Sequence, residues 1–335
     1  MSAIDKFAER ARSVSRSIVL PEGQDPRVVV AANMAMEQKV VSKIIVLGTE
    51  AEISEACAKA GITERKFESL DYMASPLFED FSNELYEMRK AKGLTIEKAR
   101  QMISSRIYFG AMMCRRDMVN GLVAGSIAST ADMLRAAFHC IGTAKGIKIA
   151  SSTFVMALRE PTESGDEVLL FSDCGVNPNP DADQLVDIAM ATCQSYRAML
   201  GQTPKVAFLS FSTKGSADHE ILVKIREATE KFKQKIADEK LDILCDGELQ
   251  ADAAIVPSVG AAKAPGSEVA GSANVLIFPD LNCGNICYKL VQRLGKAEAY
   301  GPVLQGLAKP LNDLSRGCSA EDIYGEIVIT VCQSI

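Results

Sequence analysis

The sequence lacks the features that mark several large classes of protein. Its 37 basic and 43 acidic residues give a net charge of −6, and no run of five or six basic residues occurs, so no nucleic-acid partner is expected. No stretch approaches the roughly 18 unbroken apolar residues of a membrane span, so no membrane partner is expected either. Residues 1–6 lead directly into a charged amphipathic segment without a signal peptide, which predicts a cytoplasmic location.

Patterns typical of metal and nucleotide binding are equally scarce. The two histidines, His139 and His219, lie far apart and HExxH is absent, so a catalytic zinc or a histidine triad has little support. Cys283 and Cys287 lie four residues apart, but no second pair or histidine complements them at zinc spacing. The ten cysteines are therefore expected to be reduced thiols, most of them in the core. Neither a P-loop nor a GxGxxG motif is present.

Short apolar runs separated by helical patterns make up most of the chain. Such runs predict strands buried on both faces of a parallel sheet. They occupy residues 17–20, 43–48, 122–124, 147–149, 168–171, 206–209 and 275–278. Asp25 and Pro26 are placed to begin a helix after the first run, as N-cap and first helical residue, and residues 75–117 favour helix throughout. A length of 335 residues favours two domains, and the order of elements predicts an α/β fold with largely parallel sheets.

A loop rich in small and hydroxyl residues follows the third run, at the edge where open α/β sheets bind ligands. It contains Ser126 and Ser129 and leads into a helix that Thr130 is expected to cap. Its hydroxyls and the backbone N–H groups at the helix start could bind an anion. A plain capped turn explains the loop better when its residues are taken alone.

Two further loops are dense in turn-forming residues. Residues 172–180 are interpreted either as a substrate contact or as a rigid connection, with Asp181 or a nearby residue capping the helix that follows. The other loop ends at Gly284 and Asn285, which are expected to open a helix that contains Lys289. This helix start would suit a ligand that carries phosphate or adenine, and an ordinary capped helix explains it nearly as well.

The segment near the C-terminus combines an arginine, a hydroxyl and a carboxylate. Arg316 follows Ser315, and Asp322 comes six residues later. The planar guanidinium can give two parallel hydrogen bonds to a phosphate or acyl-phosphate oxygen. Asp322 also stands at the third position of a capping box that begins at Ser319, and Arg316 could form a surface salt bridge instead. The residues alone slightly favour these structural interpretations.

Six segments resemble, in the same order, the sequence blocks of the phosphate acetyltransferases (phosphotransacetylases), in the short form without extra N-terminal domains. They are VLPEGQDPRV at residues 19–28, GLVAGSIASTADMLR at 121–135, FSDCGVNPNP at 171–180, DGELQADAAIVP at 246–257, FPDLNCGNICYKLVQRLGKAEAYGP at 278–302 and NDLSRGCSAEDIY at 312–324. The family converts acetyl-CoA and phosphate reversibly into CoA and acetyl phosphate. The resemblance covers nearly the whole chain. It favours catalytic roles for Ser315, Arg316 and Asp322 over the structural roles considered above.

The resemblance implies a role for each of the residues singled out above. Asp322 would take the thiol proton from CoA as general base, Arg316 would hold acetyl phosphate, and Ser315 would donate a hydrogen bond to the same centre. Transfer would be direct, in a ternary complex, without an acetyl-enzyme, a metal or a permanently bound cofactor. Further contacts would come from Arg135, Arg89, Ser126, Ser129 and Thr130 on the phosphate side, and from Asn282, Gly284, Asn285 and Lys289 on the CoA side.

The resemblance also implies an architecture and an assembly. Two α/β domains similar to those of isocitrate and isopropylmalate dehydrogenases would flank the active cleft. Residues 1–147 and 306–335 would form the first domain, and residues 148–305 the second. The C-terminal segment would pack back on the first domain. The expected partners are CoA, acetyl phosphate, inorganic phosphate and a second copy of the chain in a homodimer.

Other functions remain open at this point. A phosphate butyryltransferase would use the same chemistry with a larger acyl pocket, and a non-catalytic CoA-binding regulatory module would not need Arg316 or Asp322. A metal-dependent decarboxylating dehydrogenase would need a carboxylate cluster and a nicotinamide site, and neither can be assembled from the sequence. Cys318 is disfavoured as a nucleophile because no histidine lies near it in the sequence to activate it.

Overall fold

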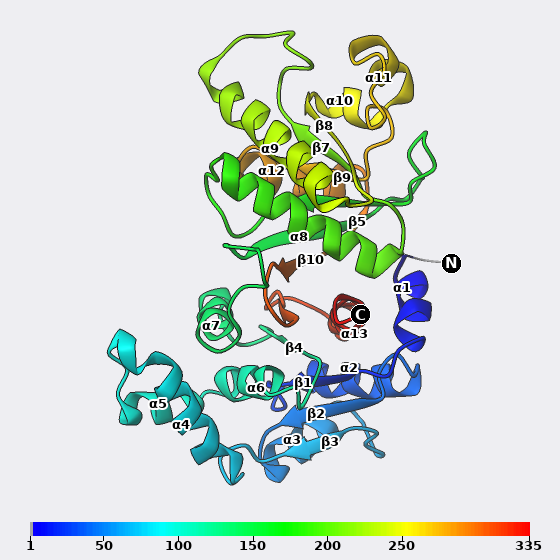
Figure 1. Cartoon of the computed structure of the whole chain (residues 1–335). Coiled ribbons are helices and arrows are strands. Elements are labelled where there is room, and N and C mark those ends of the chain that lie inside the picture. Colours follow the sequence, from blue (N-terminus) through cyan, green and yellow to red (C-terminus); the bar gives the residue numbers. More distant parts are fainter. Residues whose placement is uncertain (1–2) are drawn as a thin grey trace. The chain divides into compact units, whose positions relative to one another are not determined.

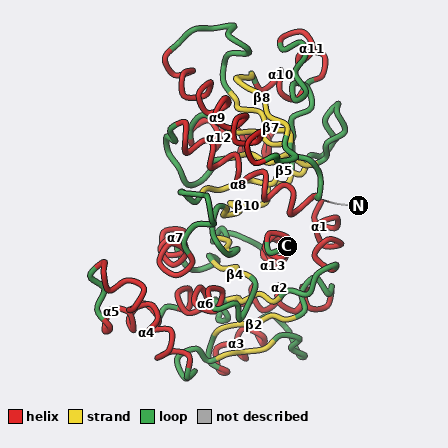
Figure 2. Tube along the Cα trace, in the orientation of Figure 1, coloured by secondary structure: helices red, strands yellow, loops and turns green. Residues whose placement is uncertain are grey.

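The computed structural model describes residues 3–335, which divide into two units. Among the described residues, unit 1 consists of residues 3–145 and Leu307–Ile335, and unit 2 of Gly146–Gly306. The C-terminal segment therefore belongs to the unit that begins the chain. Each unit contains one sheet flanked by helices. Most of the strands and helices are labelled in Figure 1, and Figure 2 colours them by type.

The sheet of unit 1 is parallel throughout. Its strands are β1 (Ser17–Leu20), β2 (Lys43–Leu47), β3 (Glu68–Leu70), β4 (Gly121–Ala124) and β11 (Leu311–Asp313). They lie in the order β11-β4-β1-β2-β3, with Ile18 beside Ile44 on one side and beside Gly121 on the other. A parallel sheet brings the carboxyl ends of its strands to one edge, so the loops after β1, β4 and β11 are neighbours there.

Helices cover this sheet and fill the segment between β3 and β4. They are α1 (Ala3–Arg12), α2 (Pro26–Glu37), α3 (Glu50–Lys59), α4 (Leu77–Arg89), the 3-10 turn η1 (Lys90–Lys92), α5 (Ile96–Ile103), α6 (Arg106–Arg115), α7 (Thr130–Ala136), the π-helical turn η2 (Ala137–Ile141) and α13 (Ala320–Gln333). The prediction of a helical region at residues 75–117 is confirmed. So is the start of α2, because the Asp25 side chain accepts a hydrogen bond from the Arg27 N–H.

The sheet of unit 2 mixes parallel and antiparallel pairs. Its strands are β5 (Ser151–Ala157), β6 (Val168–Ser172), β7 (Lys205–Leu209), β8 (Leu244–Leu249), β9 (Val275–Ile277) and β10 (Glu298–Gln305), in the order β10-β5-β6-β9-β7-β8. The pairs β10-β5 and β5-β6 are antiparallel, and the rest are parallel. Its helices are α8 (Ala182–Leu200), η3 (Glu220–Leu222), α9 (Val223–Glu239), α10 (Ala251–Ile255), α11 (Pro257–Lys263) and α12 (Leu281–Leu294).

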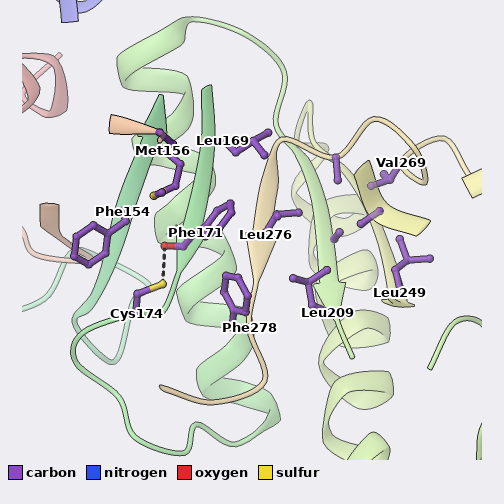
Figure 3. Close-up of a cluster of buried hydrophobic side chains, with 14 of the residues drawn as sticks. Phe154, Met156, Leu169, Phe171, Cys174, Leu209, Leu249, Val269, Leu276 and Phe278 are labelled. Carbon is purple, nitrogen blue, oxygen red and sulfur yellow. Dashed lines mark hydrogen bonds between the residues drawn. The ribbon is translucent and has the colours of Figure 1, made fainter. Parts of the chain in front are cut away.

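Aromatic and aliphatic side chains from five strands, β5 to β9, form a core of unit 2 (Figure 3). Phe171 and Phe278 are tilted against each other with ring centroids 5.4 Å apart. The Cys174 thiol donates to the Phe171 carbonyl at 3.4 Å, and burial raises the pKa of this thiol well above its usual value. All ten cysteines of the chain are free, as the sequence predicts, and most of them are buried.

One predicted strand is wrong. Residues 147–149 form no strand, and the strand begins two residues later as β5. Gly146 turns the chain with φ +81°, and the Lys148 N–H donates to Asp187 Oδ2 at 2.9 Å instead of joining a sheet. The first residues of β5 are Ser151, Ser152 and Thr153, which are buried although they are polar, so their hydrophobicity does not reveal the strand.

Candidate active site

The predicted catalytic residues and the predicted hydroxyl residues of unit 1 lie on or beside three neighbouring loops at the carboxyl edge of its sheet. Ser315 and Arg316 follow β11, the loop with Ser126 and Ser129 follows β4, and residues 21–25 follow β1. Because β11, β4 and β1 are adjacent and parallel, loops separated by about 100 to 290 residues in the sequence converge here. The edge therefore collects polar groups from three distant segments.

A buried carboxylate occupies the backbone cradle after β4. Glu22 Oε2 accepts hydrogen bonds from the N–H groups of Gly125 and Ser126 and from the Ser126 hydroxyl, each at 2.8 Å. Its Oε1 accepts from the N–H groups of Ile127 at 3.0 Å and Ala128 at 2.6 Å. The cradle predicted for an anion is present, and the anion that it holds in this structure is the side chain of Glu22. Ser126 is thus engaged in fixing two loops to each other.

The helix after this loop begins one residue earlier than predicted. Ser129, not Thr130, is the N-cap, and its hydroxyl accepts from the Asp132 N–H at 3.1 Å. Thr130 is already helical, so its hydroxyl is free to donate across the sheet edge to Asp313 Oδ2 at 2.5 Å. The hydroxyl of Thr130 therefore links the loop after β4 to the end of β11.

Asp313 is a buried carboxyl group that sequence reasoning did not single out. Burial raises its pKa to about 6, although the hydrogen bond from Thr130 and the charge of Arg316 act in the opposite direction. Its second oxygen, Oδ1, has no hydrogen-bond partner among residues 3–335. The sequence signal was only its position two residues before Ser315. Asp313 therefore places a titratable carboxyl group next to the predicted acetyl-phosphate clamp.

Arg27 braces all three loops and was also missed. Its guanidinium pairs with Asp25 at 2.6 Å and donates to the carbonyl oxygens of Ser126, Arg316 and Cys318 at 3.2, 2.9 and 2.8 Å. Burial would raise the pKa of Asp25, but the hydrogen bonds from Arg27 outweigh it and hold that pKa below its usual value. Because two of these contacts reach the backbone around Arg316, Arg27 fixes the loop from which the Arg316 side chain projects.

The capping box predicted at the start of α13 is formed. The Asp322 N–H donates to Ser319 Oγ at 3.1 Å, and the Ser319 N–H donates to Asp322 Oδ2 at 2.9 Å. Asp322 nevertheless stays exposed, as do Ser315 and Arg316 on the preceding loop. Its other oxygen, Oδ1, has no hydrogen-bond partner within the described chain. One carboxylate can therefore cap the helix and still present a free oxygen to a substrate.

The structure brings Arg89 and Arg135 into one neighbourhood. Arg89 ends α4, and Arg135 lies on α7, where it forms an ion pair with Asp132 and remains 58% exposed. Both arginines lie close enough to His139 and Tyr108 to shift the pKa values of those groups. These cations belong to unit 1, as do the three loops.

The predicted CoA-side residues all lie on α12 of unit 2, and the start of this helix differs from the prediction. The helix begins at Leu281 with Asp280 as N-cap, so Gly284 and Asn285 belong to its second turn. A side chain at Gly284 would place Cβ 2.3 Å from the Asp173 carbonyl oxygen, and Asn285 Nδ2 donates to the Cys174 carbonyl at 3.1 Å. These two residues hold α12 against the loop after β6. Asn282 and Lys289 are exposed on the same helix.

Comparison with known proteins gives a consistent result over the whole chain. The family model described as phosphate acetyl/butaryl transferase matches residues 2–331. The chain belongs to this family. It is 48% identical over 334 residues to a phosphate acetyltransferase of Thermoanaerobacterium thermosaccharolyticum, and the match covers all of both chains. Among solved structures, the EutD phosphotransacetylase from Staphylococcus aureus matches with a TM-score of 0.92 and 40% identity, over 99% of this chain and 98% of that one.

A solved structure that is named for a different activity has a similar fold. A 4-hydroxythreonine-4-phosphate dehydrogenase from Klebsiella pneumoniae matches with a TM-score of 0.56 and 10% identity, over 96% of this chain and all of that one. At that identity the likeness concerns the fold alone, and it agrees with the predicted relation to dehydrogenase-like α/β architectures. The described residues contain no group of three or more His, Cys, Asp or Glu side chains placed to hold a metal ion. No helix among them is long and apolar enough to cross a membrane.

Unit 2 of this phosphate acetyl/butaryl transferase family member also contains a cavity of about 740 Å³. It lies beside the carboxyl ends of β7 and β9, and its wall includes Leu209, Phe211, Ile221, Val223, Phe278 and Cys283. Phe211, Ile221 and Val223 are more than half exposed. The sequence analysis did not predict this cavity, because its wall is formed by several segments that are separate in the sequence.

Proposed function

We propose that the chain is a phosphate acetyltransferase, which transfers an acetyl group reversibly between CoA and phosphate. The observation that carries the proposal is the arrangement after β11. Ser315 and Arg316 project from a loop braced by Arg27, and Asp322 follows with one carboxylate oxygen free. The identity of 48% to a relative named for this activity supports acetyl as the acyl group.

In the direction of thioester synthesis, the reaction needs a thiolate and a polarised carbonyl. Asp322 accepts the thiol proton of CoA, and the sulfur attacks the acetyl carbonyl of acetyl phosphate. Arg316 and Ser315 donate hydrogen bonds that stabilise the charge developing at this centre. The carbon–sulfur bond forms as the bond between the acetyl carbon and the phosphate oxygen breaks, and phosphate leaves. Transfer is direct, CoA enters as a substrate, and no acetyl-enzyme is formed.

The remaining predicted residues are assigned to substrate binding. Arg89 and Arg135 supply positive charge for a phosphate group, and Asn282 and Lys289 are exposed for contact with CoA. Ser126, Ser129, Thr130, Gly284 and Asn285 act through the geometry of their loops and helices, because their polar groups or close contacts are engaged within the protein. The free cysteines suit a reducing compartment, and we place the enzyme in the cytoplasm.

Thioester formation followed by ultraviolet absorbance tests the proposal. Purified protein mixed with CoA and acetyl phosphate, without metal or nicotinamide, should form acetyl-CoA and release phosphate in equal amounts. Faster turnover with butyryl phosphate than with acetyl phosphate would assign the butyryl reaction instead. Absence of turnover with either acyl phosphate, with CoA binding detected by calorimetry, would indicate a non-catalytic CoA-binding module.

We also propose that the enzyme is a homodimer that associates through α12. In this helix of 14 residues only Gly284 is buried, although the helix carries several large apolar side chains. Ile286, Leu290 and Leu294 recur at intervals of four, which places them on one face, and they are 58%, 51% and 79% exposed. The wall of the cavity adds further exposed apolar side chains, and Cys283 of α12 is part of that wall. A patch of this kind on a soluble chain marks an interaction surface.

Substitution of Leu290 by aspartate is expected to convert the dimer into a monomer, because a charge would be buried at the centre of the apolar face. Sedimentation velocity at micromolar concentration should show the mass fall from twice the chain mass to once. Met73→Asp is the matched control, since Met73 is 52% exposed and lies in unit 1. A dimer that persists in Leu290→Asp, or a wild-type protein that is monomeric, would contradict this interface.

A further inference from the structure

A histidine surrounded by cations lies outside the mechanism described above. His139 is part of the π-helical turn η2, which directly follows α7. Arg135 precedes it by four residues, and Arg89 and Lys92 come from the segment α4–η1. All three cations lie close enough to influence the titration of His139. π-helical turns occur frequently at functional sites.

The imidazole ring is held in one orientation by a tyrosine. The Tyr108 hydroxyl lies 2.7 Å from His139 Nδ1, and Tyr108 itself is buried on α6. Burial raises the pKa of Tyr108 to about 12, so the phenol keeps its proton. The hydroxyl has no other acceptor among residues 3–335, so we assign it as the donor to Nδ1. In that arrangement the second ring nitrogen, Nε2, carries the ring proton. Within residues 3–335, Nε2 has no hydrogen-bond acceptor, so it is an oriented donor without a partner.

The charge around the ring is positive and largely uncompensated. Burial and the charges of Arg89, Arg135 and Lys92 lower the pKa of His139, which keeps the imidazole neutral at neutral pH. Asp132 pairs with Arg135, but no carboxylate of the described chain pairs with Arg89. Burial also raises the pKa of the neighbouring Cys140 thiol to about 12, so this group adds no negative charge. An anion is therefore the ligand that such a cluster favours.

We propose that His139 binds a phosphate group of a substrate by donating its Nε2–H to a phosphate oxygen, in a site completed by Arg89 and Arg135. This assignment rests on the proposed function, in which inorganic phosphate, acetyl phosphate and CoA all carry phosphate groups. The chemistry that the site recognises is a tetrahedral oxyanion, with two arginines for charge and one oriented neutral donor. Tyr108 is a positioning residue, because it acts on the ligand only through the ring of His139.

Replacing His139 with alanine tests the site by binding as well as by activity. Titration calorimetry with inorganic phosphate should show affinity about 10- to 100-fold weaker than in the wild type, the range expected for a hydrogen bond to a charged group. Where the bound group is the transferred phosphate, the KM for phosphate and acetyl phosphate should rise by the same factor while kcat changes little. His139→Gln, which restores an N–H donor, should recover most of the affinity. His219→Ala, at the other histidine of the chain, is the matched control.

Two arms identify which phosphate is bound. Weaker binding of inorganic phosphate with unchanged binding of CoA assigns the site to the transferred phosphate. A loss for CoA that disappears with dephospho-CoA assigns it to the 3′-phosphate of CoA, and the proposal stands in both cases. Unchanged affinity for all these ligands would overturn it. An equal loss for all of them together with a lowered melting temperature would also overturn it, since that pattern reports a structural role.

The calorimetric readout separates this inference from the proposed enzyme activity. If the wild-type protein forms no acetyl-CoA yet binds phosphate in a manner that depends on His139, the proposed function fails and the phosphate site stands. Tyr108→Phe adds a second measurement, the dependence of phosphate affinity on pH. A residue with a merely structural role would not change this dependence. Without the phenol, Nδ1 and Nε2 compete for the ring proton, so phosphate affinity should fall about threefold or more and recover as the pH drops and both nitrogens become protonated.

Discussion

Asp322→Asn is expected to lower kcat for thioester formation by about 100- to 10,000-fold, the range by which a positioned general base accelerates proton transfer. The fold should persist, because the asparagine side-chain oxygen can still accept the hydrogen bond from the Ser319 N–H that Asp322 accepts now. Only the ability to take a proton is removed. Far-ultraviolet circular dichroism and a melting curve would check the fold, and initial rates with CoA and acetyl phosphate would check the chemistry.

The pH profile of this variant identifies the lost step. An ordinary thiol has a pKa near 8.5, so in the absence of a base the rate should follow the thiolate fraction and rise about tenfold per pH unit below that value. Arg316→Gln provides the contrast. It should lose about 100- to 1000-fold at every pH, because a donor to the developing charge is missing while the base remains. Near-normal turnover of Asp322→Asn across pH would rule out the general-base role.

A control separates the cap of α13 from catalysis. Ser319→Ala removes the side chain that accepts the Asp322 N–H, and loss of an N-cap side chain costs about 1 kcal/mol of stability. It leaves the Asp322 carboxylate and the Ser319 backbone donor in place. This variant should therefore be less stable and retain its kcat. A loss of kcat as large as that of Asp322→Asn would show that the geometry of the cap, and not proton transfer, explains the effect.

Local chemistry in the sequence was enough to predict several details of the fold. Asp25 caps α2, Asp181 caps α8 through a capping box with Gln184, and Ser319 caps α13, each as its neighbours indicated. These features depend on residues within one helical turn of each other. The strands buried on both faces were likewise predicted where the run was apolar throughout, as at residues 122–124 in β4 and residues 168–171 in β6.

Features that depend on distant partners were not predictable. Nothing near Glu22 indicates that its carboxylate would fill a backbone cradle about 100 residues later, and the hydroxyls in that cradle pointed to an external anion instead. Arg27 lies in the first turn of α2, and nothing near it in the sequence indicates its contacts with Arg316 and Cys318 about 290 residues away. Both interactions depend on the order of the strands in the sheet. A single sequence does not reveal which loops that order brings together.

A buried glutamate on the helix that carries Asp322 predicts an unusual dependence of stability on pH. Glu326 lies one turn beyond Asp322 on α13 and is 3% exposed, and its Oε1 has no hydrogen-bond partner in the described chain. Burial raises its pKa from about 4.5 to about 8, and the nearby charges of Asp313 and Asp322 act in the same direction. Folding therefore favours the protonated form of Glu326, so the side chain is neutral at pH 7.

The sign of the effect follows from proton binding. Between pH 4.5 and pH 8 the folded state holds a proton that the unfolded chain has released, so the free energy of unfolding should fall as pH rises through this window. A pKa difference of this size corresponds to about 3 to 5 kcal/mol once the group is fully ionised. Raising the pH also ionises Asp313, whose pKa is about 6, and this adds to the same trend.

Glu326→Gln should remove most of this dependence, because the amide is neutral at every pH and nearly the same size as the protonated acid. Urea denaturation should show little difference from the wild type at pH 5 and a variant more stable by about 3 to 5 kcal/mol at pH 9. Glu321→Gln is the matched control on the exposed first turn of α13 and should change stability by about 0.5 kcal/mol at most.

If the wild type and Glu326→Gln lost stability in parallel between pH 5 and pH 9, another group would be responsible for the titration. Equal stability of the two at pH 9 would mean that the buried site tolerates an ionised Glu326, which its lack of partners makes physically costly.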